Sequence, residues 1–407
     1  ERKMEKQGST TFQIPGLGEV SLASSEKRRR ETVAAYFLSL YFMIPATFLV
    51  WITSFYLLFF CKIMAVKVLL VGYFTFAFVI DKSPKTGSRL TFLRSNANWV
   101  WSHACDYFPI TLVKTAELDP KKSYVMGYHP HGVISVGAMC SFATDGAQTR
   151  SVVKKETGGF FFKKKEATPS GEEKNNVRGF SSLFPGIDRR LVTLPTNFQT
   201  PILREYILSM GCCDSSKETF RNVLSRNNGE GNALVVVVGG AAESMLVQPG
   251  TMDLLLKTRR GFVREAIIAN ASLVPVIAFG ETDLYQVFEP GSHWVRSFQE
   301  RVKSFTGVAL PIFNGRSLFF KDFGLMPQRK PIEVVVGAPL DPPKLAEEQR
   351  KNFYPKFDRE TKKAMNDDAK IVEKFHNQYV EAVEQLYSKL KNAKWNEPGR
   401  NRKRSLV

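Results

Sequence analysis

One long apolar stretch dominates the N-terminal part of the chain. Residues 33–61 contain no charged side chain, and this length of 29 residues exceeds the roughly 20 that cross the hydrocarbon core of a bilayer. Pro45 lies inside the stretch, where it can kink a helix or mark the turn of a hairpin. We therefore predict a membrane-embedded helical segment; a pair of buried core helices is the alternative interpretation of the same pattern.

A second apolar stretch follows Lys62 and ends at Ile80, interrupted by Lys67. Its unbroken part, residues 68–80, is short for an independent span. Basic residues flank the whole apolar region, namely Lys27, Arg28, Arg29 and Arg30 before it and Lys82, Lys85, Arg89 and Arg94 after it. Because basic flanks favour the cytosolic side, we predict a hairpin over residues 31–82 with both ends in the cytosol. A cleaved signal peptide does not fit the length and position of the segment.

Beyond residue 83 the pattern changes to short apolar strands that alternate with helices. Strands are predicted at 123–128, 233–238, 273–279 and 333–336, and helices at 133–140, 202–210 and 261–270. The unbroken valine run at 235–238 is typical of a strand buried on both faces. A C-terminal amphipathic helix is predicted from Ile371, Phe375, Tyr379, Ala382, Leu386 and Leu390, which recur at helical spacing. Such alternation predicts an α/β layered domain over residues 83–395.

Four polar segments lie outside this pattern. Residues 1–30 form a polar tail, and residues 396–407 form a basic one. Segment 145–180 is rich in lysine, glycine and serine, and segment 341–369 is also polar. Segments that cannot bury apolar surface stay unfolded, so we predict a disordered insert at each of these two places.

The composition narrows the choice of partners. The 407 residues carry a formal net charge of +18, which points to nucleic acid, a membrane surface or a phosphate-rich substrate. No recognised nucleic-acid-binding module accompanies the charge, so nucleic acid is not expected. The five cysteines are an odd number without zinc-site spacing, which argues against a disulfide framework and suits a reducing compartment.

The candidate chemistry centres on the sequence Tyr128-His129-Pro130-His131-Gly132. The chain has only five histidines, and two of them lie one residue apart at the end of a predicted strand. Residues i and i+2 of an extended segment face the same way, so we expect both rings to line one cleft. A neutral imidazole can take a proton from a hydroxyl group near neutral pH. His131 is the first candidate for this base and His129 the second.

Other interpretations of the two histidines stay open. One of them can hold the loop through hydrogen bonds to the backbone, or both can be structural. A metal site would need further ligands, and no other His or Cys lies at a useful spacing. We therefore expect no metal.

A second motif, Gly239-Gly240-Ala241-Ala242-Glu243, follows the valine strand. Small residues let the backbone approach a ligand closely, and Glu243 places a carboxylate at a strand end. Parallel strands bring such ends together at one edge of a sheet, so Glu243 is a candidate partner of the histidines. A glutamate near a helix N-terminus is the ordinary alternative. A serine hydrolase would need a G-x-S-x-G elbow, and the chain has none.

Three cations follow this motif at helical spacing. Lys257, Arg260 and Arg264 stand at i, i+3 and i+7, which predicts one stripe on a helix. Such a stripe can bind phosphate groups through charge-assisted hydrogen bonds. A solvated or headgroup-facing surface explains each of them equally well.

Taken in order, these motifs resemble the diacylglycerol acyltransferase type 2 family, which includes monoacylglycerol and wax-alcohol acyltransferases. The resemblance covers most of residues 33–340 and 371–392. Besides the two motifs above, it rests on Tyr107-Phe108-Pro109, Asn197-Phe198, Leu203-Arg204-Glu205-Tyr206, Arg260-Gly261-Phe262-Val263-Arg264, Leu273-Val274-Pro275 and Phe279-Gly280. Phe37, Leu38 and Leu40 also match the family's neutral-lipid-binding motif.

The resemblance implies a glycerolipid-acyltransferase-like layered sheet preceded by the membrane hairpin. It also implies an enzyme of the endoplasmic reticulum and lipid droplet that transfers a fatty acyl group from acyl-CoA to diacylglycerol. Acyl-CoA is then a co-substrate, and no cofactor is needed. Pro130, Gly132, Gly239 and Gly240 would line the substrate site, together with the three cations. Whether the chain forms a homo-oligomer stays open.

Some features are specific to this chain. Related glycerolipid acyltransferases place an Asp five residues after the catalytic His, where this chain has Ile134 or Val136, so Glu243 takes the orienting role. Asn270 replaces a glycine that is usual for the family at a helix end, and it tolerates the same left-handed backbone. Monoacylglycerol and long-chain alcohols are alternative acceptors, and a non-catalytic hairpin protein of lipid droplets is the alternative outside enzymes.

Overall fold

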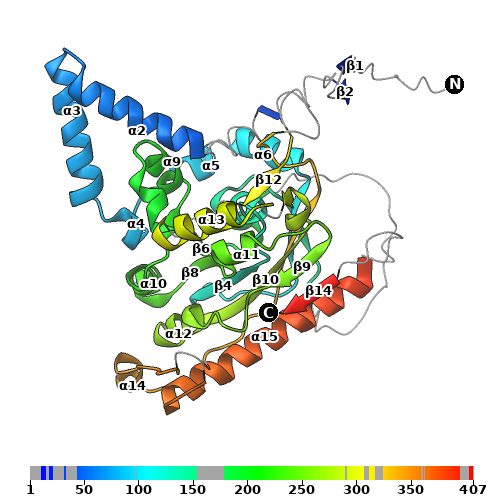
Figure 1. Ribbon diagram of the computed structural model, residues 1–407. Helices are drawn as coiled ribbons and strands as arrows, with labels where there is room; N and C mark the ends of the chain where they lie inside the picture. The colour runs from blue at the N-terminus through cyan, green and yellow to red at the C-terminus, as the bar shows by residue number, and fades with distance from the viewer. Residues whose placement is uncertain are drawn as a thin grey trace, which may run out of the picture.

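The domain is built around an eight-stranded sheet that is largely parallel (Figure 1). The computed structural model describes residues 11–14, 18–21, 32–33, 44–96, 98–153, 178–288, 291–306, 311–316, 324–358, 361, 363–394 and 403–406. Within these residues the strand order is β5-β3-β13-β10-β4-β8-β6-β7. Neighbouring strands run parallel except for the antiparallel pair β10 and β13. The predicted α/β class is confirmed.

The strands of this sheet are β3 (Ile110–Lys114), β4 (Tyr124–His129), β5 (Gln148–Ser151), β6 (Asp188–Thr193), β7 (Cys212–Asp214), β8 (Asn232–Val237), β10 (Ser272–Phe279) and β13 (Ile332–Val336). The four strands predicted from apolar runs correspond to β4, β8, β10 and β13. All eight residues of β10 are buried, as expected for a strand covered on both faces. Smaller pairs are formed by β1 (Thr11–Ile14) with β2 (Gly18–Ser21), β11 (Gln286–Phe288) with β12 (Ile312–Asn314), and β9 (Thr251–Leu254) with β14 (Lys403–Leu406).

Helices cover both faces of the sheet, and each face has its own hydrophobic core. One layer contains α6 (Asn98–Tyr107), α7 (Val136–Ala138), η2 (Met139–Ala143), α8 (Phe180–Leu183) and α9 (Leu203–Ser209). The other contains α10 (Lys217–Leu224), α12 (Gly261–Ile268) and α15 (Asp367–Lys394). Short helices elsewhere are α4 (Ser83–Thr86), α5 (Phe92–Asn96), η3 (Pro195–Gln199), η4 (Arg226–Gly229), α11 (Gly240–Ser244), η5 (Glu281–Asp283) and α14 (Glu347–Lys351), and a longer one is α13 (His293–Thr306).

The predicted C-terminal helix is confirmed as α15, but its buried stripe differs from the predicted one. Phe375 and Tyr379 are buried as expected. Val372, Val383 and Tyr387 complete the stripe, while Ile371, Leu386 and Leu390 pack at its edge and are only partly buried. A period of 3.6 residues lets two adjacent rows share an apolar face, and contact with the sheet decides between them.

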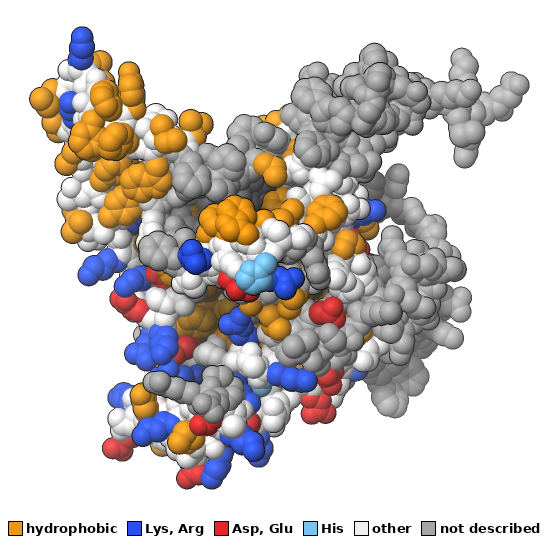
Figure 2. Space-filling model, in the orientation of Figure 1, with side chains coloured by type: hydrophobic (Ala, Val, Ile, Leu, Met, Phe, Trp, Pro, Cys, Tyr) orange, Lys and Arg blue, Asp and Glu red, His pale blue; other side chains and the backbone are white. Residues whose placement is uncertain are grey.

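Two apolar helices project from the domain at the N-terminal end (Figure 1). They are α2 (Ile44–Phe59) and α3 (Met64–Thr75), and η1 (Phe76–Ile80) continues α3. Among the described residues, one segment, Met64–Thr86, is long and apolar enough to cross a membrane, with a mean hydropathy of 1.8. Only 6% of its most apolar window is buried, so these are not core helices. Apolar side chains cover this arm in Figure 2.

The two helices meet at a turn other than the one that Pro45 suggested. Pro45 lies in the first turn of α2, where proline is tolerated. The chain turns instead between Phe59 and Met64, next to Lys62. Trp51 of α2 then packs against Phe74 of α3, with ring centroids 5.9 Å apart.

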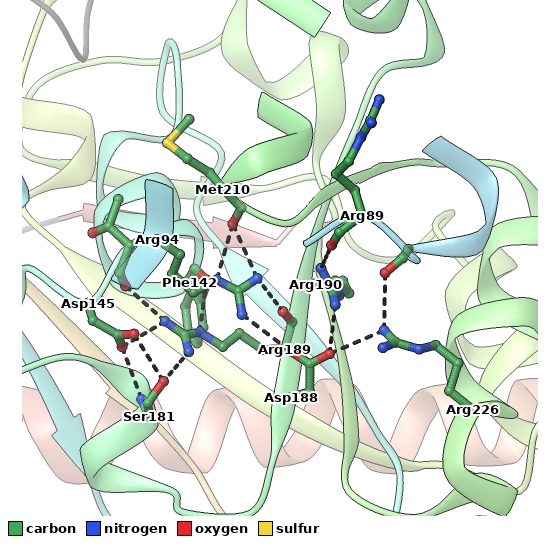
Figure 3. A network of polar contacts seen from close by, with 12 residues as sticks. Arg89, Arg94, Phe142, Asp145, Ser181, Asp188, Arg189, Arg190, Met210 and Arg226 are labelled. Carbon is green, nitrogen blue, oxygen red and sulfur yellow. Dashed lines mark hydrogen bonds and ion pairs between the residues drawn. The ribbon is translucent and has the colours of Figure 1, made fainter. Parts of the chain in front are cut away.

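A network of arginines and aspartates ties the segment after the apolar helices to the sheet (Figure 3). Arg94 of α5 donates to the carbonyl oxygens of Arg189 and Met210 and pairs with Asp188 at 3.2 Å. Burial and the neighbouring charge of Arg189 lower the pKa of Arg94 to about 9. Asp81 pairs with Arg204 of α9 at 2.7 Å. The apolar arm is therefore held against the domain through buried charges that have partners.

Some polar segments contain more structure than predicted. In segment 341–369, α14 forms and Phe353 is buried in the core, so the described part is not the expected disordered insert. In segment 145–180, Gln148–Ser151 form edge strand β5 and Phe180 begins α8; residues 154–177 lie outside the described residues. The pairs β1–β2 and β9–β14 place strands in the two predicted tails.

Candidate active site

The candidate site lies where β4 ends between two parallel neighbours. Strand β8 pairs with β4 on one side and β10 pairs with it on the other. Because all three run the same way, their carboxyl ends reach the same edge of the sheet. The loop at 130–135 begins there, and a carboxylate follows each neighbouring strand: Glu243 after β8 and Glu281 after β10. The predicted meeting of the histidine loop with Glu243 is thereby found.

The His131 ring is held in one orientation. Its Nδ1 lies 2.9 Å from the carbonyl oxygen of Gly132. A carbonyl only accepts hydrogen bonds, so Nδ1 carries the proton and Nε2 keeps its lone pair. Burial lowers the pKa of His131, although the hydrogen bond to Gly132 opposes this. The ring is therefore neutral near pH 7, with Nε2 ready to accept a proton.

Glu243 holds the backbone of this loop instead of the imidazole. Its Oε1 accepts from the backbone N–H of His131 at 2.6 Å, and its Oε2 accepts from the backbone N–H of Leu255 at 2.8 Å. Burial raises the pKa of Glu243, and these two hydrogen bonds oppose the rise. The expected contact between Glu243 and a histidine ring is absent among the described residues; the carboxylate positions the main chain that carries His131.

His129 lies in a different environment from His131. Its side chain is buried, and its Nε2 lies 2.9 Å from the hydroxyl of Tyr379, which donates to the carbonyl oxygen of Gly127 at 3.1 Å. Burial, together with the charge of His376, lowers the pKa of His129 to about 3. The two rings thus do not line one cleft as expected, and the geometry of His129 fits a neutral group that ties β4 to α15.

Glu281 is the residue that the sequence did not indicate. It is 2% exposed, and its Oε2 accepts from the hydroxyl of Tyr128 at 2.6 Å and from the backbone N–H of Gly137 at 2.8 Å. Its Oε1 is buried without a hydrogen-bond partner. Burial raises the pKa of Glu281 to about 7, so the group is largely protonated below neutral pH. Its position after Phe279-Gly280, at the end of a buried strand, was the available signal.

Glu281 also packs directly against the histidine loop. Gly132 has φ +62°, and a Cβ atom there would lie 2.8 Å from Cγ of Glu281. Any larger residue would therefore clash and adopt a backbone conformation that side chains disfavour. The helix predicted from residue 133 begins only at Val136, because Gly132, Val133 and Ile134 form the turn that places the loop over Glu281.

The predicted stripe of cations is not a single helical face. Helix α12 begins at Gly261, so Lys257 and Arg260 precede it. Arg260 pairs with Glu373 of α15 at 3.1 Å and lies over the ring of Phe357, and Arg264 lies 3.7 Å from Glu265. Lys257 is exposed. A further exposed cation, Arg259, donates to the carbonyl oxygen of Gly239 at 3.2 Å and so lies beside the site.

The remaining predicted residues fall into two groups. Pro130 and Gly239 are buried at the strand ends, and the partly exposed Gly240 has φ +60° with no atom within 4 Å of a built Cβ. Phe37, Leu38 and Leu40 lie outside the described residues. No group of three or more metal-ligating side chains occurs in the part of the chain that the structure describes. The arrangement is suited to proton transfer from a hydroxyl group to a neutral imidazole.

The comparisons with known proteins match most of the chain to one family. The family model described as "Diacylglycerol acyltransferase" matches residues 56–157 and 174–357. Diacylglycerol O-acyltransferase 2A of Umbelopsis ramanniana is 36% identical over 79% of this chain and 77% of its own length. Diacylglycerol O-acyltransferase 2 is 36% identical in Dictyostelium discoideum, over 82% of this chain and 88% of the relative. The human protein of that name is 38% identical over 79% and 70%. No solved structure matches the chain.

Proposed function

The chain belongs to the diacylglycerol acyltransferase family, and we propose that it transfers a fatty acyl group from acyl-CoA to the free hydroxyl of diacylglycerol. The products are triacylglycerol and CoA. The observation that carries the proposal is the His131 ring, whose Nδ1 is tied to Gly132 and whose Nε2 is left as the acceptor. A base of this kind can activate a lipid hydroxyl.

The proposed reaction is a direct transfer without an acyl-enzyme. Nε2 of His131 removes the hydroxyl proton as the oxygen attacks the thioester carbonyl, and the carbon–sulfur bond then breaks. The CoA thiolate takes the proton back from the imidazolium, so the enzyme returns to its starting state. Backbone N–H groups at Gly132 or at Gly239 and Gly240 are the candidates for stabilising the oxyanion.

Two buried carboxyl groups are proposed to position the base. Glu243 holds the N–H of His131 from the β8 side, and Glu281 holds Tyr128 and Gly137 from the β10 side. The loop that carries His131 is thus attached at both ends. Among the described residues, neither carboxyl forms a hydrogen bond with the imidazole. Glu243 acts through the backbone of His131, and Glu281 acts through the Tyr128 hydroxyl and the backbone of Gly137, so both are positioning residues.

Acyl-CoA needs cations near the site for its phosphate groups. Lys257 and Arg259 are exposed, and Arg259 contacts the carbonyl of Gly239 next to the histidine loop. Charge-assisted hydrogen bonds from such groups bind phosphate well. We therefore assign the phosphate groups to Lys257 and Arg259. Arg260 is a weaker candidate because its charge is paired with Glu373.

The acceptor is tested with membranes that contain the chain. Labelled acyl-CoA is supplied with diacylglycerol, monoacylglycerol or a long-chain alcohol in turn, and the products are separated. We expect triacylglycerol to be the main product, since the relatives are named for this reaction. A profile dominated by wax ester, or by diacylglycerol made from monoacylglycerol, would show that the acceptor assignment is wrong.

The membrane arrangement is a further part of the proposal. One described segment, Met64–Thr86, can cross a membrane by length and composition, and α2 packs beside it through Trp51. Two apolar helices joined by a short turn, with basic residues on both flanks, fit a hairpin with both ends in the cytosol. We place the enzyme in the endoplasmic reticulum, with access to lipid droplets and the active site toward the cytosol.

Protease protection tests this topology. Tags are placed at the N-terminus and in segment 154–177, and sealed microsomes are treated with protease before and after detergent. We expect both tags to be digested without detergent. Protection of either tag until detergent is added would contradict the hairpin and the cytosolic site.

A further inference from the structure

Helix α13 presents a row of bare aromatic side chains to the outside of the domain. Trp294 is 75% exposed and Phe298 is 51% exposed. They stand four residues apart, so they share one helix face, and their rings stack at 6.1 Å. Gln299, about 100° around the helix from Phe298, is buried against the domain. Helix α13 therefore keeps two large aromatic side chains on its exposed surface, whereas an ordinary surface helix turns such side chains toward the core.

The segments on either side of α13 extend this apolar surface. Strand β11 precedes the helix and β12 follows it, and Phe288 of β11 lies directly opposite Ile312 of β12. Both side chains are exposed. A single exposed apolar residue needs no explanation, but a contiguous group marks a binding surface.

The same side of the molecule carries the apolar arm. Figure 2 shows hydrophobic side chains over α2 and α3 and again over α13, while charged side chains gather over α12 and α14. Between arm and domain, Leu90, Phe92 and Ile202 are also exposed. The backbone N–H of Ile202 donates to the hydroxyl of Tyr73 in α3 at 3.1 Å, which joins the candidate membrane helix to this surface.

We propose that α13 is a second membrane-contacting element, which lies in the plane of the lipid surface with Trp294 and Phe298 among the acyl chains. The partner is a lipid surface with anionic headgroups. An indole has an apolar body and a polar N–H, which suits the boundary between headgroups and acyl chains. Arg296 and Arg301 are exposed on the same helix and can meet the headgroups, as cations of interfacial helices do. Continuity with the apolar arm favours lipid over a protein partner.

The test uses the full chain reconstituted into vesicles whose lipids carry bromine on the acyl chains, which quenches tryptophans that reach them. The fluorescence of Trp294 is obtained as the difference between the wild-type chain and the Trp294→Phe chain. We expect the brominated lipid to quench this fluorescence, and we expect acrylamide dissolved in the water to leave it unquenched. The matched control is Trp101→Phe, because Trp101 is 3% exposed in the core and donates to the carbonyl of Leu93; its signal should not be quenched by the lipid.

Two outcomes would overturn the proposal. If acrylamide quenches Trp294 in vesicles as it does in detergent, the helix faces water. If Trp294 is shielded from both quenchers in vesicles, another protein surface, such as a second copy, covers α13. Since the readout does not use acyl transfer, failure here leaves the proposed reaction untouched, and a catalytically inactive chain can still pass.

Discussion

Replacement of His131 by alanine should lower the rate of triacylglycerol formation by roughly 10²- to 10⁴-fold, the usual effect of losing a general base. The protein should still fold, because Glu243 binds the backbone N–H of His131, which alanine retains. Within the described residues, the ring's own hydrogen bond goes to the adjacent carbonyl of Gly132. Rates measured in microsomes at matched expression test this, with His103→Ala as the control for loss of a histidine far from the loop.

His129→Ala should behave differently from His131→Ala. It removes a buried partner of Tyr379 and opens a cavity between β4 and α15, so we expect less folded protein and a lower unfolding temperature. If His129→Ala folded normally but lost activity, and His131→Ala kept near-normal turnover, the two roles would be reversed.

The pH dependence gives an independent check on the base. His131 must be neutral to accept a proton, and burial lowers its pKa below the ordinary value of 6.5. Activity should therefore be retained at neutral pH and should fall only as the pH drops below about 6.5 through this lowered pKa. An activity that requires protonated histidine would instead fall as the pH rises.

Glu281→Ala should also cause a large loss of activity. It leaves the Tyr128 hydroxyl and the Gly137 N–H buried without their acceptor, at about 1–3 kcal/mol for each group, and releases the loop that carries His131. Glu281→Gln is the informative partner variant. Its amide oxygen can accept both hydrogen bonds, and its NH₂ group takes the place of Oε1, so it resembles the protonated acid. We expect it to keep most of the wild-type kcat.

The stability of these variants separates positioning from a direct role in proton transfer. The pKa of Glu281 is raised from 4.5 to about 7 in the folded protein. The unfolded chain loses this proton near pH 4.5, whereas the folded chain keeps it up to about pH 7. The free energy of unfolding that Glu281 contributes is therefore largest below pH 4.5 and declines as the pH rises to about 7. Unfolding of wild type and Glu281→Gln across this range should show a steeper decline in wild type, because Glu243 and Glu265, whose pKa values are also raised, titrate in both chains. An inactive but stable Glu281→Gln would mean that the ionised carboxylate takes part in the chemistry.

The sequence predicts the centre of the fold better than its edges. Strands β4, β8 and β10 follow from unbroken apolar runs, which only a fully covered sheet explains. Strand β6 contains Asp188, Arg189 and Arg190 and gives no such pattern. Asp188 pairs with Arg190, and Asp145 and two carbonyl oxygens bind the buried Arg189. Such pairing joins residues far apart in the chain and leaves no local signal.

Contacts between residues far apart in the chain also limit what the sequence predicts about the site. Adjacent strand ends place the histidine loop beside Glu243, and this follows from the motifs and parallel pairing. That the carboxylate binds a backbone N–H instead of a ring depends on the turn at Gly132, which spacing does not reveal. Glu281 acquires its role only because β10 pairs on the other side of β4.

One assay of three membranes decides whether His131 is the base of a diacylglycerol acyltransferase. These contain the wild-type chain, the His131→Ala chain at equal abundance, or neither, and each receives labelled acyl-CoA and diacylglycerol. We expect labelled triacylglycerol from the wild-type chain alone, with His131→Ala near the background. Triacylglycerol formed by His131→Ala at the wild-type rate, or no product above background from the wild-type chain, would contradict it.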